Sequence, residues 1–120
     1  MPNKLLIVDD SESIRELVGY NLEDAGYKVV KAVNGKDGLE KLNEEIKLIV
    51  SDLNMPVMDG ITMIKNIRKE PKYKHLPIIM LTTESQQGIK NEARKAGATA
   101  WIVKPFDRDK LIQVIKRFVR

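Results

Sequence analysis

Leu5-Leu6-Ile7-Val8-Asp9-Asp10, an apolar run that ends in two acids, is the stretch that decides the fold. Three further short apolar runs follow, at residues 48–50 (Leu-Ile-Val), 78–81 (Ile-Ile-Met-Leu) and 101–103 (Trp-Ile-Val). Continuous rather than alternating apolarity is typical of strands covered on both faces, as in a parallel sheet. A weaker run at residues 27–31 has lysines within it and is predicted to be an edge strand.

The segments between these runs carry apolar residues at helical spacing. The clearest stripes are Ile14, Leu17, Val18, Leu22 and Ala25; Ile61, Ile64 and Ile67; and Leu111, Ile112, Ile115, Phe118 and Val119. Ser11 or Ser13, Asn34 and Asp107 are expected to cap helices. Five strand–helix units in succession predict the α/β class, as a doubly wound (βα)5 sandwich with a five-stranded parallel sheet. We expect one domain over residues 1–120, without an appended effector domain.

Composition excludes several classes of protein. The 120 residues contain no cysteine, which removes disulfide scaffolds and thiolate chemistry. The first apolar run is too short for a signal peptide or a membrane span, so a cytoplasmic protein is expected. The net charge of +4 permits contact with nucleic acid, but aromatic residues make up only 5%. The basic residues between Lys65 and Lys95 are therefore interpreted as solvated helix faces, and nucleic-acid binding as unlikely.

Polar residues end the apolar runs at Asp9-Asp10, Asp52, Thr82 and Lys104-Pro105. Ligands of open α/β sheets bind outside the carboxyl ends of the strands, so these side chains should converge at one rim. Taken singly, each has an ordinary alternative: a helix cap, a turn residue, a local hydrogen bond or a solvated charge. Together they predict a site.

Three clustered carboxylates repel one another unless a cation joins them. A donor set of oxygen atoms alone favours a hard cation such as Mg²⁺, which also accepts phosphate oxygens. Lys104 then supplies a point charge for an anion, and Thr82 a hydroxyl donor. The only histidine, His75, precedes the fourth strand and lies away from this rim, and no glycine-rich nucleotide loop is present.

These residues resemble the receiver domains of two-component response regulators. The matching pieces are Leu6 to Asp10, Asp52 with Met55-Pro56 and Asp59-Gly60, Thr82, and Lys104-Pro105-Phe106. They span nearly the whole chain and are most similar to stand-alone members of the chemotaxis type. The resemblance implies a flavodoxin-like strand order, 2-1-3-4-5.

The resemblance also implies roles for the rim residues. Asp52 would accept a phosphoryl group from a phosphohistidine on a sensor histidine kinase, of the CheA type if the role is chemotactic. Asp10, Asp52 and the backbone carbonyl of Asn54 would hold Mg²⁺, with Asp9 acting partly through water. Lys104 would neutralise charge on the phosphoryl group.

Further positions are implied to transmit or tune the signal. Thr82 would move towards the new phosphate and Trp101 would turn inward, in a place where the family usually has Tyr or Phe. Asn54 and Glu84 occupy positions that tune loss of the phosphate, which would occur by Mg²⁺-dependent autodephosphorylation. The Lys104–Pro105 peptide is expected to be cis.

The leading hypothesis is a phosphorylation-activated signalling module that works by changed partner binding, with no membrane partner. Its target would be the flagellar motor switch or another effector protein, and a phosphatase is a further possible partner. The rival is a small Mg²⁺-dependent phosphohydrolase or phosphotransferase that acts on a diffusible substrate. A rim of short side chains, without residues for a substrate pocket, weighs against the rival.

Overall fold

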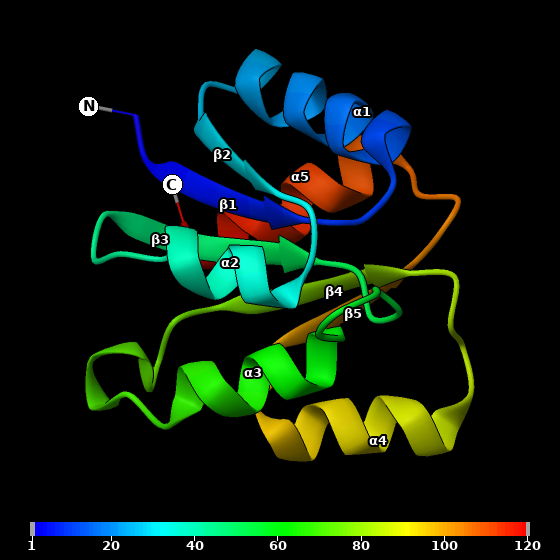
Figure 1. The fold of residues 1–120 in the computed structure, drawn as a ribbon. Coiled ribbons are helices and arrows are strands. Elements are labelled where there is room, and N and C mark those ends of the chain that lie inside the picture. Colours follow the sequence, from blue (N-terminus) through cyan, green and yellow to red (C-terminus); the bar gives the residue numbers. More distant parts are fainter. Residues whose placement is uncertain (1, 120) are drawn as a thin grey trace.

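Five parallel strands form a single sheet in the computed structural model, which describes residues 2–119. The strands are β1 (Lys4–Val8), β2 (Lys28–Ala32), β3 (Ile46–Ser51), β4 (Ile78–Thr82) and β5 (Ala100–Val103). They lie in the order β2-β1-β3-β4-β5 (Figure 1). The predicted fold class and strand order are confirmed, and β2 is an edge strand as its composition indicated.

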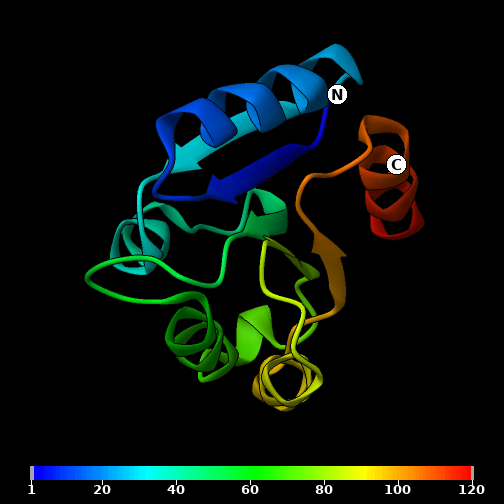
Figure 2. The same cartoon turned by 90° about the vertical axis from the view of Figure 1, so that its right-hand side faces the viewer.

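Helices cover both faces of the sheet. α1 (Glu12–Asp24) and α5 (Arg108–Phe118) lie on one face, and α2 (Gly35–Lys41), α3 (Gly60–Arg68) and α4 (Gln87–Ala96) on the other (Figures 1 and 2). A short 3-10 helix, η1 (Pro71–Tyr73), precedes β4 and was not predicted from the sequence. Within residues 2–119, no helix has the length and apolarity needed to cross a bilayer.

Side-chain caps fix where four of the helices begin. Ser11 caps α1, Asn34 caps α2 and Asp107 caps α5, each by accepting a hydrogen bond from a backbone N–H of the first turn. The predicted caps are thus confirmed, and Ser11 rather than Ser13 serves α1. Asp59 caps α3 in the same way, through Oδ1 and the Thr62 N–H (2.8 Å).

Two apolar clusters, one on each face of the sheet, hold the helices in place. Alternate residues of the central strands supply them, so that Leu5 and Ile7 pack towards α1 and α5 while Leu6 and Val8 pack towards α2 and α3. Two residues of the predicted stripes lie outside the core: Leu17 is 49% exposed and Phe118 is 43% exposed. Each continues a helical spacing but lies on the exposed side of its helix.

Gly60, the first residue of α3, allows the helix to start directly against the end of β3. A Cβ atom at this position would lie 2.5 Å from the Asp52 backbone oxygen, which is closer than real Cβ contacts allow. Gly60 also donates its N–H to the Leu53 carbonyl (2.8 Å). The β3–α3 connection therefore depends on the absence of a side chain here.

Substitution of two glycines by alanine should change stability in opposite directions. Gly60→Ala should lower the free energy of unfolding by about 1–3 kcal/mol, because the new methyl group meets backbone atoms that cannot move aside. Gly88→Ala in α4, where nothing lies within 4 Å of an added Cβ, should raise it by about 0.5 kcal/mol through reduced chain entropy. Urea midpoints at unchanged m-value measure both effects. Equal midpoints for the two variants would contradict this account of Gly60.

Candidate phosphoacceptor and metal site

The site lies where the strand order reverses, at the carboxyl ends of β1 and β3. The parallel hydrogen bonding continues one residue beyond the strands: Asp52 N–H donates to Val8 O (2.9 Å) and Asp9 N–H donates to Ala32 O (3.1 Å). Asp9 and Asp52 therefore begin from adjacent, fixed backbone positions. This is the crevice in which ligands of doubly wound sheets bind.

Asp9, Asp10 and Asp52 form a single cluster, with one carboxylate oxygen from each within 4.8 Å of the others. They differ in exposure: Asp9 is buried, Asp52 is half-buried and Asp10 is exposed. The sequence-based prediction that these three acids come together at one rim is correct. Their mutual repulsion makes the cluster a place where positive charge is stabilising.

Lys104 places its positively charged ammonium group within the cluster. Its Nζ lies 2.8 Å from Asp9 Oδ2 and 3.4 Å from Asp52 Oδ2, and its side chain is only 11% exposed. Its backbone N–H donates to Thr82 O (2.8 Å), which fixes the start of the side chain beside β4. A partly buried ammonium so placed attracts any anion that approaches Asp52.

Asp9 is held by its neighbours on both carboxylate oxygens. Oδ1 accepts from the Ser11 N–H (2.9 Å), and Oδ2 accepts from Lys104. Burial raises the pKa of Asp9 above its usual value, while the hydrogen bonds from Lys104 and the Ser11 N–H act in the opposite direction. Because both carboxylate oxygens already accept hydrogen bonds, the Asp9 side chain has little freedom to turn towards a ligand.

The donor set of the cluster fits a hard divalent cation. Asp10 is exposed, and Asp52 Oδ1 accepts a hydrogen bond only from the Leu53 N–H (2.7 Å), so both can turn an oxygen to an incoming ion. Three carboxylates without nitrogen or sulfur donors suit Mg²⁺. Asp10 and Asp52 are the more available ligands, because Asp9 is buried and has the shorter contact with Lys104, 2.8 Å against 3.4 Å for Asp52.

Asn54 lies in the loop between β3 and α3 and is exposed. The loop contains a tight turn in which Met58 N–H donates to Pro56 O (2.8 Å), with Val57 at φ 71°. A branched side chain in this backbone region is strained. A hydrogen bond from Gly35 N–H to Met58 O (3.0 Å) ties the turn to the start of α2.

Thr82 and Glu84 connect the end of β4 to α4. Thr82 is fully buried, and its Oγ1 accepts a hydrogen bond from the Glu84 N–H (3.2 Å). An accepting hydroxyl oxygen retains its own proton for donation. The Glu84 side chain caps its own loop by accepting from the Ser85 N–H (3.1 Å).

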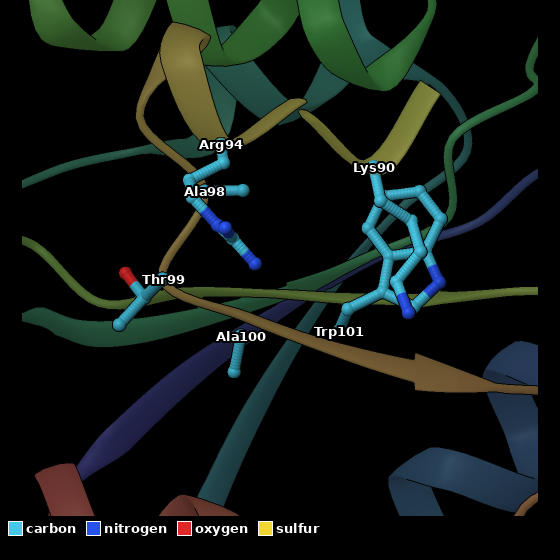
Figure 3. Close-up of a pocket in the computed structure, with 6 residues that line it drawn as sticks. All are labelled: Lys90, Arg94, Ala98, Thr99, Ala100 and Trp101. Carbon is cyan, nitrogen blue, oxygen red and sulfur yellow. The ribbon is translucent and has the colours of Figure 1, made fainter. Parts of the chain in front are cut away.

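Trp101, on β5, contacts the same loop from the other side. Its indole Nε1–H donates to the Glu84 carbonyl (3.0 Å), and the ring is half-buried against the apolar cluster on the α4 face. The Lys90 Nζ lies over the ring, 6.0 Å from its centre. Figure 3 shows the two side chains next to each other. The indole therefore links β5 to the β4–α4 loop. The Lys104–Pro105 peptide is cis, as expected.

Arg15, which sequence reasoning did not select, also belongs to this rim. Its Nη1 donates to the Asp9 backbone carbonyl (2.7 Å). A positive charge near the beginning of a helix is unfavourable in the helix dipole. The position of Arg15 in the first turn of α1 is therefore the one feature of the sequence that could have indicated a special role for it. His75, by contrast, is exposed and lies just before β4, at the opposite end of the strands from the acids.

Comparison with known proteins agrees with this geometry. The family model of the response regulator receiver domain matches residues 5–116. The chain is 42% identical to chemotaxis protein CheY1 of Helicobacter pylori over 86% of each chain. It resembles the solved structure of the chemotaxis response regulator CheY4 of Vibrio cholerae, with a TM-score of 0.90 and 43% identity over 99% of this chain and 100% of that one.

A more distant solved structure is also informative. The receiver domain of the sensor histidine kinase PA1611 of Pseudomonas aeruginosa was solved with a magnesium ion coordinated in its active-site cleft. The identity is 26%, the coverage is 98% of each chain, and the TM-score is 0.87. Sequence, fold and the acidic rim thus lead to one conclusion: the chain belongs to the family of response regulator receiver domains, which are signalling domains of two-component systems and not turnover enzymes.

Proposed function

We propose that this protein is a phosphorylation-activated response regulator that receives a phosphoryl group on Asp52 and signals by changed partner binding. One observation supports the assignment above all: the Lys104 ammonium lies between the carboxylates of Asp9 and Asp52. A carboxylate that is to become an acyl phosphate needs a fixed positive charge beside it. Asp52 is half-buried at the rim and has the longer contact with Lys104, whereas Asp9 is buried and has the shorter one.

The transfer uses Asp52 as nucleophile. A carboxylate oxygen of Asp52 forms a bond to phosphorus while the phosphorus–nitrogen bond of a phosphohistidine breaks, and the departing imidazole keeps the electron pair and takes up a proton. Lys104 moves from its longer contact with Asp52 to the phosphoryl oxygens and neutralises part of their charge. Because Lys104 also pairs with Asp9, it stays at the rim throughout.

Asp10, Asp52 and the Asn54 carbonyl would hold Mg²⁺, with Asp9 contributing through water. The ion supplies positive charge that stabilises the phosphoryl oxygens in transfer and in the later loss of the phosphate. Asn54 and Glu84 would tune this loss from either side of Asp52. The magnesium in the related PA1611 receiver domain supports the same assignment.

The switch would run through Thr82, Glu84 and Trp101. If the Thr82 hydroxyl turns to bond the phosphoryl group, it releases the Glu84 N–H that it now accepts. Glu84 in turn carries the carbonyl that receives the Trp101 indole. Each contact depends on the one before it, so phosphorylation at Asp52 would reach β5 without contact between Trp101 and the phosphate.

The relatives support a role in chemotaxis. Two of them are named chemotaxis proteins, and this chain matches 86% and 92% of their lengths. The partners would be a sensor histidine kinase of the CheA type, an effector such as the flagellar motor switch, and a phosphatase. A cytoplasmic location suits all three.

Phosphorylation should occur on Asp52 alone. Incubation with acetyl phosphate and Mg²⁺ should add one acid-labile phosphoryl group to the wild type, as seen in the intact mass, and none to Asp52→Asn. Asp59→Asn is the matched control, because Asn caps a helix as well as Asp and α3 should remain folded. If Asp52→Asn gains the same mass as the wild type, Asp52 is not the acceptor.

Mg²⁺ should stabilise the unphosphorylated protein through Asp10. At a concentration one hundred times the dissociation constant, binding adds about 2.7 kcal/mol to the free energy of unfolding. Asp10→Ala should lose this gain and, because one repelling carboxylate is gone, should be more stable than the wild type without metal. Melting temperatures over a Mg²⁺ titration measure both. Asp109→Ala, which removes an exposed carboxylate elsewhere, should respond as the wild type does.

Trp101 fluorescence should report activation. Addition of beryllofluoride, a phosphate mimic, with Mg²⁺ should change the emission or the quencher accessibility of this single tryptophan, because its hydrogen bond to Glu84 is disturbed. Thr82→Ala should weaken the change and Asp52→Ala should abolish it, and Mg²⁺ alone is the control. Unchanged emission and quenching, with the mimic shown independently to be bound, would make Trp101 a static core residue.

A further inference from the structure

Arg15 donates a hydrogen bond to the peptide that joins the two acids after β1. Its Nη1 donates to the carbonyl of Asp9 at 2.7 Å, and the side chain is half-buried. The Asp9 carbonyl and the Asp10 N–H belong to the same planar peptide unit. The orientation of that carbonyl therefore sets the direction in which the Asp10 backbone continues.

The carboxylate of Asp10 has no bonding partner in the part of the chain that the structure describes. Within residues 2–119, no hydrogen bond or ion pair holds this side chain, whereas Asp9 and Asp52 are each bonded at both carboxylate oxygens. The position of the Asp10 carboxylate thus depends on the backbone from which it leaves. Two hydrogen bonds hold the backbone just before Asp10. The Asp9 N–H donates to the Ala32 carbonyl, and the Asp9 carbonyl accepts from Arg15.

The charge of Arg15 cannot explain its presence beside a cation site. A guanidinium at this rim repels Mg²⁺, and its place near the start of α1 is unfavourable in the helix dipole. The charge of Arg15 also acts on Asp37 in α2. Burial raises the pKa of Asp37, but hydrogen bonds from the Val33 N–H and Lys41 outweigh it and lower the pKa. The positive charges of Lys41 and Arg15 lower it further. If Arg15 favours cation binding, it does so through its hydrogen bond to the Asp9 carbonyl and not through its charge.

We infer that Arg15 is a positioning residue for the cation site: its bond to the Asp9 carbonyl orients the Asp9–Asp10 peptide so that the Asp10 carboxylate faces Asp52. The inference rests on the proposed function, since it takes the bound ion to be Mg²⁺ at these acids. Arg15 itself touches neither the ion nor the phosphoryl group. Residues that hold metal ligands in orientation affect metal affinity by about tenfold to one hundredfold.

Calorimetric titration of the unphosphorylated protein with MgCl₂ tests the inference directly. Arg15→Met keeps an unbranched stem that can pack in place of the arginine methylenes and removes the donors, so it should weaken Mg²⁺ binding by about tenfold. Arg15→Lys retains a donor that can reach the carbonyl and should recover most of that loss. Arg108→Met removes an exposed guanidinium that pairs with Asp24 on the α1–α5 side, and it should leave the affinity unchanged.

The direction of the change separates positioning from charge. If Arg15 acted only as a nearby cation, its removal would make Mg²⁺ bind more tightly; equal or tighter binding by Arg15→Met would overturn the inference. Circular dichroism and the metal-free melting temperature should show that both Arg15 variants are folded. A wild type that binds no Mg²⁺ would overturn the proposed function as well. If the wild type binds and Asp10→Ala does not, while Arg15→Met matches the wild type, only the role of Arg15 is lost.

Discussion

The rim depends on one ammonium group between two carboxylates. Lys104 follows β5, Asp9 follows β1 and Asp52 follows β3, so this contact joins the far edge of the sheet to its centre. Without it, three acids within 4.8 Å would repel one another in a partly buried place. The contact with Asp9 is the shorter of the two, at 2.8 Å against 3.4 Å. Lys104 is therefore anchored by one acid and remains within reach of a group on the other.

A second feature of this geometry is that hydrogen bonds join the ends of β4 and β5. Lys104 N–H bonds the Thr82 carbonyl, Thr82 Oγ1 accepts from Glu84, and Glu84 O accepts from Trp101. Two of these hydrogen bonds involve side chains that begin on neighbouring strands. Direct contacts thus lead from Asp52, through Lys104, to the β4–α4 loop and Trp101. On the other face of the sheet, α1 reaches the rim through Arg15, whose side chain bonds the Asp9 carbonyl.

Much of the fold was predictable because the apolar runs are continuous and end in polar residues. Leu5 to Val8 is buried on both faces as such a run indicates, and the caps at Asn34 and Asp107 follow from residue type alone. Periodicity failed at Leu17 and Phe118, since a spacing rule does not show how far the sheet extends beneath a helix.

The acids of the site could be predicted because each directly follows a strand, and parallel strands bring such residues together. The hydrogen bond from Arg15 to Asp9 could not, because the position of a long side chain depends on rotamers and on the turn to which it bonds. The same applies to the indole of Trp101. The sequence placed it on β5, but its hydrogen bond to Glu84 depends on the path of a loop in another part of the chain.

The strained turn at Val57 has a thermodynamic consequence for binding. Its backbone conformation costs about 1–3 kcal/mol for a residue with a Cβ, and the surrounding hydrogen bonds from Met58, Gly35 and Gly60 hold it in place. A loop held by these hydrogen bonds should have little conformational entropy left to lose when a ligand binds. Rigidity of this kind lowers the stability of the free protein and raises the affinity of whatever contacts the loop. In calorimetric terms, binding there should show a small unfavourable entropy from chain ordering.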